Sequence, residues 1–547
     1  MTNLTLLSAA AATVLTLAAP PAARAQTDAG IPVTDPLVRA KCGTCHAVDD
    51  RGQMERVSWA RATPEGWQAA TKRMIVEDGV ALTPIEARAI VGYLSSKHAL
   101  APEEAQPVMY AAERRIQDEA QAMNAAVAAA CGKCHQAARA LSWRRIAADW
   151  TRFVDRHAAQ YRFTPDAKAV TALKEAAPLH TRAWDAWSAG APTPAIAGQW
   201  LVTAHVPGRG NFYGEMEVEA TGERDAFLTR TRLRSVDGTT VLARTGRSVV
   251  YAGTAWRGRS SGSSAATAAP DDPSGEMQEA MLIASGGSSA EGRWFRGQYQ
   301  ELGIDVKMQR ASGSPVVLLV DPPSLKTGSS ASRLRLVGNR FPSSVTAADL
   351  SAGPGVTVRR VVSSAPDEIV AEVDVAPDAP LGRRAVAFRS SALQNAVAIY
   401  DRVDDIKVKP DSSLASFGSQ TYVRGYQQFE AVGYHRGPDG KRRTADDVEL
   451  GPVDVTWSME VFYDVDQSRQ DRVGAVSAAG FFTPSAANGG INSDVWIVAT
   501  AKSEKGADGK PLVGKGYLVV TVPTYTFEGR TYVRDLDRWI EEGSSPR

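Results

Sequence analysis

Apolar and polar residues follow two different patterns along the chain. Up to about residue 190, apolar residues recur at helical spacing. One example is the segment from Pro84 to Leu94, which begins at the capping-box sequence Thr83-Pro84-Ile85-Glu86 with proline at the first helical position. From Gly198 onwards, apolar and polar residues alternate in short runs between turn residues, which is typical of antiparallel strands. The pattern predicts a multidomain α + β protein that is helical first and β-rich afterwards.

Turn-rich linkers divide these two parts into domains. Residues 1–25 contain an apolar run and the sequence Ala23-Arg24-Ala25, which predicts a signal peptide cleaved on export. Residues 26–190 form the predicted all-α domain, in which one long helix is expected from Pro102 to about Ala130. No later segment is long and apolar enough to span a membrane. The β-rich part is predicted to contain an antiparallel β-barrel and two immunoglobulin-like β-sandwiches, at residues 195–312, 314–402 and 403–547.

The overall composition is that of an ordinary globular protein. The 547 residues include 62 Lys and Arg and 61 Asp and Glu, so the formal net charge is +1. A balance this close to neutrality gives no electrostatic reason to expect a nucleic-acid partner. The function must therefore be sought in local motifs.

Two short motifs carry the chemistry. Residues Cys42 to His46 and Cys131 to His135 both read C-x-x-C-H, the attachment signature of a c-type haem. In this motif two thiols bond to one porphyrin, and the adjacent histidine binds the iron. A bare C-x-x-C could be half of a zinc site or a redox dithiol, but each pair here is followed by a histidine and no cysteine is left over. The sequence predicts two covalent haems, attached at Cys42, Cys45, Cys131 and Cys134, with His46 and His135 as proximal ligands.

An internal repeat nominates the sixth iron ligands. Trp67 precedes Met74 by seven residues, and Trp150 precedes His157 by the same number. We therefore expect Met74 to complete the first haem site and His157 the second. The all-α domain is accordingly predicted to be a tandem of two cytochrome c units, at about residues 28–100 and 101–187.

Other residues compete for these roles. A methionine at helical spacing is usually a core residue, and Met54 and Met109 are rivals of Met74. His98 and His180 are rivals of His157, and both fall about thirty residues after the tryptophan of their unit. Because the repeat places these two histidines alike, one or both could instead lie near a haem propionate.

The ligand types suggest a direction of electron transfer. Methionine raises the reduction potential of a haem relative to histidine. With Met74 in the first unit and His157 in the second, electrons are expected to run from the second haem to the first.

Two features outside the helical part carry side chains that could form binding sites. The loop at residues 437–447 carries three carboxylates near a turn and could hold a calcium ion. The neighbouring cations Lys441, Arg442 and Arg443 favour an ordinary hairpin loop instead. His205 and His435 are isolated among predicted strands, and we expect them to have structural roles.

The order of these features resembles a known family. A tandem pair of unequal cytochrome c units followed by three β domains is similar to the large, α subunit of quinohaemoprotein amine dehydrogenase. The resemblance covers essentially the whole chain after the signal peptide. It rests on the two haem motifs, on residues 83–94, on Ala101 to Ala105 and on the domain order.

The resemblance implies a periplasmic heterotrimer that oxidises primary amines to aldehydes and ammonia. In such an enzyme a β-propeller subunit and a small subunit accompany the dihaem chain, and the small subunit carries a cysteine tryptophylquinone. This chain would then pass electrons from that quinone to a soluble acceptor such as a small copper protein or a cytochrome c. The sequence agrees by exclusion, because such a quinone needs a free cysteine and both haem motifs together use all four.

Two other functional classes stay open at this level. A dihaem cytochrome c peroxidase would need an open or displaceable sixth position at one iron, which Met74 and His157 argue against. A non-catalytic haem protein whose sandwiches serve in adhesion would lack a quinone-bearing partner.

Overall fold

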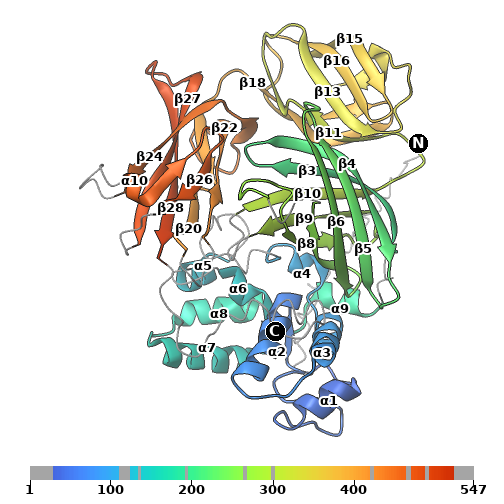
Figure 1. Cartoon of the computed structure of the whole chain (residues 1–547), viewed down its shortest axis with the longest axis vertical. Helices are drawn as coiled ribbons and strands as arrows, with labels where there is room; N and C mark the ends of the chain where they lie inside the picture. Colours follow the sequence, from blue (N-terminus) through green and yellow to red (C-terminus); the bar gives the residue numbers. More distant parts are fainter. Residues whose placement is uncertain are drawn as a thin grey trace, which may run out of the picture.

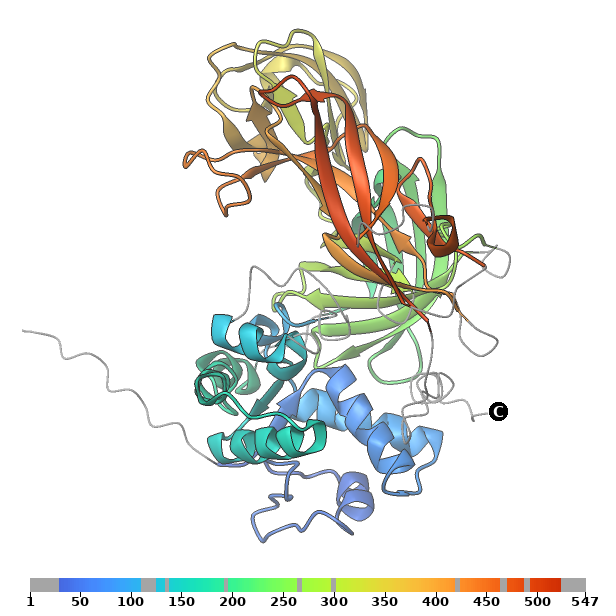
Figure 2. The ribbon, with the colours of Figure 1, turned by 90° about the vertical axis from the view of Figure 1, so that its left-hand side faces the viewer.

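The structure is a computed structural model, and it describes residues 29–109, 124–132, 137–190, 195–262, 268–296, 302–418, 424–462, 470–486 and 492–522. The helices of the N-terminal region gather at one end of the molecule, shown at the bottom of Figure 1. A β-barrel lies next to them, and two further groups of sheets lie beyond and beside the barrel (Figure 1, Figure 2). The helical region therefore lies against the barrel, with α3 (Pro84–Lys97) contacting β6 (Val241–Tyr251) and α4 (Pro102–Ala105) contacting β8 (Met277–Ile283).

The helical region consists of short helices with clear end signals. The side chains of Thr83 and Glu86 form the predicted capping box, with Pro84 at the first helical position, and this prediction is confirmed. The helices are α1 (Pro36–Cys42), α2 (Pro64–Val76), α3 (Pro84–Lys97), α4 (Pro102–Ala105), α5 (Ala125–Cys131), α6 (Ala137–Leu141), α7 (Ala147–Tyr161), α8 (Ala167–Ala176) and α9 (Arg182–Ser188).

The single long helix predicted from Pro102 to about Ala130 is wrong. Helix α4 ends at Ala105, and α5 begins only after Asn124, whose side chain accepts hydrogen bonds from the first turn as an N-cap. Residues 110–123, in the middle of the prediction, lie outside the described part of the chain. The alanine-rich composition favours helix here, but an N-cap residue with extended backbone interrupts it.

A two-stranded sheet joins the two halves of the helical region, so the predicted all-α description is not complete. Strand β1 (Ala60–Ala62) leads into α2, and β2 (Trp143–Arg145) leads into α7. The two strands are antiparallel, with Arg61 opposite Arg144 at the centre. Because equivalent strands pair about their central residues, the two halves are related by an approximate two-fold axis at this pair.

The next domain is a closed barrel of eight antiparallel strands, as predicted. Strand β10 pairs with both β9 and β3 and thereby closes the sheet. Alternate side chains point inward, and the interior is filled around Trp200, Trp256 and Trp294. The strands are β3 (Gly198–Val206), β4 (Gly210–Ala220), β5 (Ala226–Ser235), β6 (Val241–Tyr251), β7 (Ala255–Ser261), β8 (Met277–Ile283), β9 (Ser289–Arg296) and β10 (Leu302–Arg310).

Two sheets of four strands form the third domain. Leu336 and Ile369 from one sheet and Phe388 and Ile399 from the other belong to a single buried cluster, so the sheets pack face to face. One sheet contains β11 (Val316–Asp321), β13 (Ser332–Asn339), β16 (Glu368–Val375) and β15 (Val356–Ala365). The other contains β12 (Ser324–Lys326), β18 (Ser391–Tyr400), β17 (Gly382–Phe388) and β14 (Leu350–Ser351).

The last domain contains one sheet of four strands and two of three. All three sheets contribute to one core, for example through Val408, Phe482 and Ile497. The four-stranded sheet contains β20 (Ser412–Ser416), β28 (Pro511–Thr521), β27 (Ser493–Lys505) and β24 (Val455–Val461). One three-stranded sheet contains β19 (Asp405–Lys409), β22 (Glu430–His435) and β23 (Val448–Pro452). The other contains β21 (Gln427–Gln428), β26 (Phe481–Pro484) and β25 (Gly474–Val476). A short helix, α10 (Gln470–Val473), precedes β25.

His205 links the barrel to this last domain. Its Nε2 lies 2.9 Å from Oε2 of Glu430 on β22, and its Nδ1 lies 2.8 Å from Oδ1 of Asn211. Burial alone would lower the pKa of His205, but the hydrogen bond and charge of Glu430, helped by Asn211, raise it to about 9. The imidazolium is therefore favoured in the folded protein at neutral pH.

This contact makes the stability of the protein dependent on pH. Because the pKa of His205 rises from about 6.5 to about 9 on folding, its contribution is complete below pH 6.5 and is lost as the pH rises through 9. We expect the free energy of unfolding to fall across this window, and His205→Gln to flatten that part of the curve. Denaturant unfolding of both proteins from pH 6 to pH 10 measures the effect, and parallel curves would contradict it.

Candidate haem sites

The first C-x-x-C-H motif begins at the end of α1. Helix α1 is capped by Asp35 and includes Cys42, and the backbone N–H groups of Cys45 and His46 bond to the carbonyl of Cys42. The motif is thus a continuation of the helical turn, which keeps the two thiols and the imidazole close together. Cys42 is partly buried and Cys45 is exposed, and neither is in a disulfide.

The surroundings of His46 favour its neutral form. Its Nδ1 is buried and makes no hydrogen bond to a described residue, although the backbone of Glu55 is near enough to affect its pKa. Burial is the main cause of a lowered pKa at His46, with the charge of Arg56 second, so the neutral, ligating form is favoured. A neutral histidine beside two unpaired thiols fits the donor set of a covalently attached haem.

The second motif begins in the same way at the end of α5. Cys131 is the last residue of α5, as Cys42 is of α1, and the next residue caps each helix. Cys131 is partly buried. Cys134 and His135 lie outside the described residues, so the structure places only the first thiol of this motif.

The two proposed sixth ligands occupy the same position on corresponding helices. Trp67 and Met74 are the fourth and eleventh residues of α2, and Trp150 and His157 are the fourth and eleventh of α7. Met74 and His157 are both partly buried. The two helices therefore present a thioether and an imidazole at matching places.

Aromatic rings surround His157. It stacks on Phe153 at 5.7 Å and contacts Tyr161 at 4.7 Å and Phe163 at 5.7 Å between ring centroids. These three rings are 42%, 49% and 45% exposed. A partly exposed apolar surface around an imidazole suits a flat apolar macrocycle.

The sequence repeat predicts that His98 and His180 occupy equivalent positions in the two units, and this prediction is wrong. The indole N–H of Trp67 donates to the carbonyl of His98 at 2.8 Å, whereas that of Trp150 donates to Ala177 at 2.7 Å. His98 and Ala177 are the residues that follow α3 and α8, so they are the true counterparts. Helix α8 has 10 residues and α3 has 14, and this shortening moves His180 beyond the equivalent place.

The two histidines also have different surroundings. His98 is fully buried, its Nδ1 lies 3.3 Å from the carbonyl of Ala60, and burial lowers its pKa to about 4. Nε2 of His180 lies 2.7 Å from the carbonyl of Ala29, and its ring contacts Trp184. Both side chains hold the helical region together through contacts with backbone carbonyls.

Comparison with protein families assigns the chain. Four family models match it in succession, all described as parts of the alpha subunit of quinohemoprotein amine dehydrogenase. The chain belongs to this family. The first model, described as haem binding, covers residues 33–173, and those for domains II, III and IV cover 193–311, 314–401 and 406–529. The resemblance inferred from the sequence is confirmed, and the protein is a subunit of a multisubunit amine dehydrogenase, an oxidoreductase.

Other comparisons add little. No curated protein matches the chain. Among solved structures, a redesigned β-barrel, mFAP1, bound to DFHBI, is similar at 12% identity over 21% of this chain and 94% of that one, with a TM-score of 0.17. Immunoglobulin domains 1–4 of Sidekick-1 are similar at 11% identity over 60% of this chain and 97% of that one, with a TM-score of 0.14. TM-scores this low do not support any assignment of fold or function.

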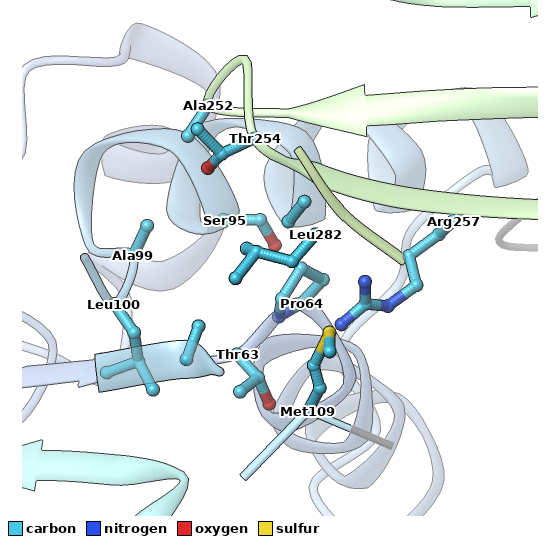
Figure 3. Close-up of a pocket in the computed structure, with 12 residues that line it drawn as sticks. Thr63, Pro64, Ser95, Ala99, Leu100, Met109, Ala252, Thr254, Arg257 and Leu282 are labelled. Atoms are coloured by element: carbon cyan, nitrogen blue, oxygen red, sulfur yellow. The ribbon is translucent and has the colours of Figure 1, made fainter. Parts of the chain in front are cut away.

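The rival methionines of this alpha subunit lie in packed surroundings. Met54 is fully buried in the core of the first unit with Val38, Trp67 and Ile90. Met109 is 7% exposed and lines a cavity of about 20 Å³ between the helical region and the barrel (Figure 3). Arg257 of the barrel borders the same cavity and pairs with Glu65 of α2. This space is suited to a single water molecule and cannot hold a haem.

A buried charge cluster, which we name the Arg61–Glu104–Arg144 cluster, lies where the two halves of the helical region meet. Arg61 donates two hydrogen bonds to Glu104, of 2.7 and 3.0 Å, and Nε of Arg144 lies 3.5 Å from the same carboxylate. Thr181 donates a further bond of 2.7 Å. Burial alone would raise the pKa of Glu104, but Arg61 and then Arg144 lower it, so the carboxylate is ionised. Sequence reasoning missed this cluster, because its members share no motif.

The loop at residues 437–447 uses its carboxylates internally. Asp439 accepts from the backbone of Lys441, Asp446 from Thr444, and Asp447 from the backbone of Arg443. In the described part of the chain, no group of three or more His, Cys, Asp or Glu side chains is placed to hold a metal ion. These hydrogen bonds favour the hairpin-loop interpretation. None of the described helices is long and apolar enough to cross a membrane.

Proposed function

We propose that this chain is the dihaem electron-transfer subunit of a periplasmic quinohemoprotein amine dehydrogenase. The observation that carries the proposal is the pair of C-x-x-C-H motifs, each starting at a helix end, within a region that matches the family's haem-binding model. The enzyme would oxidise primary amines, with the quinone on a small partner subunit and a β-propeller subunit completing the heterotrimer. All four cysteines are used by the motifs, which agrees with a quinone carried elsewhere.

Each group in the chain has a defined role under this proposal. Cys42 and Cys45 attach one haem and Cys131 and Cys134 the other, while His46 and His135 are the proximal ligands. Met74 of α2 and His157 of α7 complete the two iron sites. Bound haem would supply one-electron transfer, and sulfur ligation by Met74 would give its site the higher potential.

The buried Arg61–Glu104–Arg144 cluster fixes the two units relative to each other. The rate of electron transfer depends on the separation of the two centres, and a rigid joint at the two-fold axis would keep this separation constant. The acceptor would be a soluble protein such as a small copper protein or a cytochrome c.

Mass spectrometry and amine-dependent reduction test the proposal. We expect the secreted chain to carry two added haem masses, and the double variant Cys131→Ser/Cys134→Ser to carry one. In the assembled complex a primary amine should reduce the haems, whereas the isolated chain should not respond. Rapid turnover of peroxide, or ready binding of cyanide by the ferric chain, would instead favour a peroxidase and overturn the assignment.

A further inference from the structure

Arg145 of β2 lies in a cage of aromatic rings. Its guanidinium carbon is 4.7 Å from the ring centroid of Trp143, 5.3 Å from that of Phe153 and 5.7 Å from that of Trp150. The side chain is partly buried, and its Nε is shielded from solvent. Aromatic faces attract a cation but accept few of the five N–H bonds that a guanidinium can donate.

No described carboxylate satisfies these donors. Nε of Arg145 has no hydrogen-bond partner among the described residues, and none of their acidic side chains forms an ion pair with it. Burial lowers the pKa of Arg145 to about 10, the charge of Asp149 opposes this shift and that of Arg73 adds to it. The carboxylate of Asp149 is itself paired with Arg152. Such a buried donor is costly unless an anion takes it.

The neighbouring arginines differ in this respect. Arg61 and Arg144, which face each other across β1 and β2, share the carboxylate of Glu104. Arg145 is adjacent to Arg144 in the sequence but points to the other side of the strand, toward α7. The Arg61–Glu104–Arg144 cluster therefore does not neutralise the guanidinium of Arg145, which lies on the side of the second unit.

Phe153 connects Arg145 to the proposed ligand. Phe153 lies one helical turn before His157 on α7, and their rings stack with an interplanar angle of 13°. Arg145 is in contact with the same phenyl ring. The guanidinium of Arg145 and the imidazole of His157 therefore both contact the ring of Phe153.

We propose that Arg145 binds a propionate carboxylate of the haem in the second unit. A propionate projects from the rim of the porphyrin, whereas the imidazole of His157 would address its centre, so both groups can serve the same macrocycle. Arginine is suited to this role because its planar fork matches a carboxylate with two hydrogen bonds. The inference rests on the proposed function, since it requires a haem at Cys131 to His135.

The first unit has no equivalent group. Arg145 immediately precedes the cap residue of α7, and the residue at that place before α2 is Ala62. A fixed positive charge favours the reduced state of a nearby haem, which carries one positive charge less than the oxidised state. Arg145 therefore raises the potential of the second haem and reduces the difference that Met74 creates.

Redox titration of the assembled complex carrying Arg145→Gln tests this proposal. At a fixed potential we expect at least a tenfold shift of the second haem toward the oxidised state, which is about 59 mV for a one-electron couple. The first haem should be unchanged. Arg145→Lys keeps the positive charge, so the potential of its second haem should lie close to that of the unmutated protein.

Arg156→Gln is the matched control. Arg156 is an exposed arginine on the same helix, so solvent and salt screen its charge and the potentials should not move. If Arg145→Gln does not assemble, resonance Raman spectra of Arg145→Lys should still show a displaced propionate-bending band. Two haems with unchanged potentials in Arg145→Gln, or an unaltered band in Arg145→Lys, would overturn the inference. A chain with no covalent haem would instead refute the proposed function.

Discussion

Replacing Glu104 by alanine is expected to lower the free energy of unfolding of the helical region by about 3–5 kcal/mol. The change removes the only carboxylate that Arg61 and Arg144 share in the described structure. Arg61 is fully buried and Arg144 is 6% exposed, so water cannot replace the lost partner. Two guanidiniums would then face each other at the joint between the two halves of the helical region. Denaturant unfolding followed by far-ultraviolet circular dichroism measures the loss.

Glu103 offers the control for this experiment. It is the neighbouring residue on α4, has the same side chain and is exposed. We expect Glu103→Ala to change the free energy of unfolding by less than about 0.5 kcal/mol, as most surface substitutions do. Equal effects of the two substitutions would show that Glu104 contributes helix propensity or capping and that its buried charge is unimportant.

Replacing Met74 by histidine is expected to remove most of the difference in potential between the two haems. The first site would then have two imidazoles, as we propose for the second, and imidazole favours the oxidised state relative to a thioether. Axial ligands span about 0.8 V across haem proteins, so the change should greatly exceed the 59 mV of one tenfold step. Spectroelectrochemical titration of the holoprotein gives both potentials.

The rival methionines provide the comparison. Met54→Leu and Met109→Leu keep the volume of each side chain approximately and should leave both potentials in place. Met54 is fully buried in the core and Met109 lines the cavity against the barrel, whereas Met74 on α2 is only partly buried. A loss of the high potential in Met54→Leu, with Met74→His unaffected, would reassign the sixth ligand. Equal or reversed haem potentials in the unmutated protein would refute the direction of electron transfer.

Local features were readable from the sequence. The capping box at Thr83 is confirmed because its two side chains bond to the backbone of the same helical turn and need no distant partner. Alternation in the β-rich part predicted the barrel, because inward and outward positions differ at every second residue. Both haem motifs also depend only on neighbouring residues, and the family's haem-binding model supports haem binding in this region.

The lengths of the helices and the equivalence of residues between the two units were harder to predict from the sequence. The predicted linking helix failed because an N-cap at Asn124 overrides alanine propensity. The match between His98 and His180 failed because equal distances from a tryptophan do not guarantee equal helix lengths, and α8 is shorter than α3. Only the indole hydrogen bonds to His98 and Ala177 identify the true counterparts.

Haem binding and the succession of domains could be inferred from the sequence, since thiols, imidazoles and alternation act over a few residues. Which charges meet depends on how the chain folds. Arg61, Glu104 and Arg144 are far apart in the chain and come together through the pairing of β1 with β2. The same pairing leaves Arg145 among aromatic rings without a carboxylate partner in the described residues. Burial sets the cost of an unpaired charge, and burial exists only once the chain has folded.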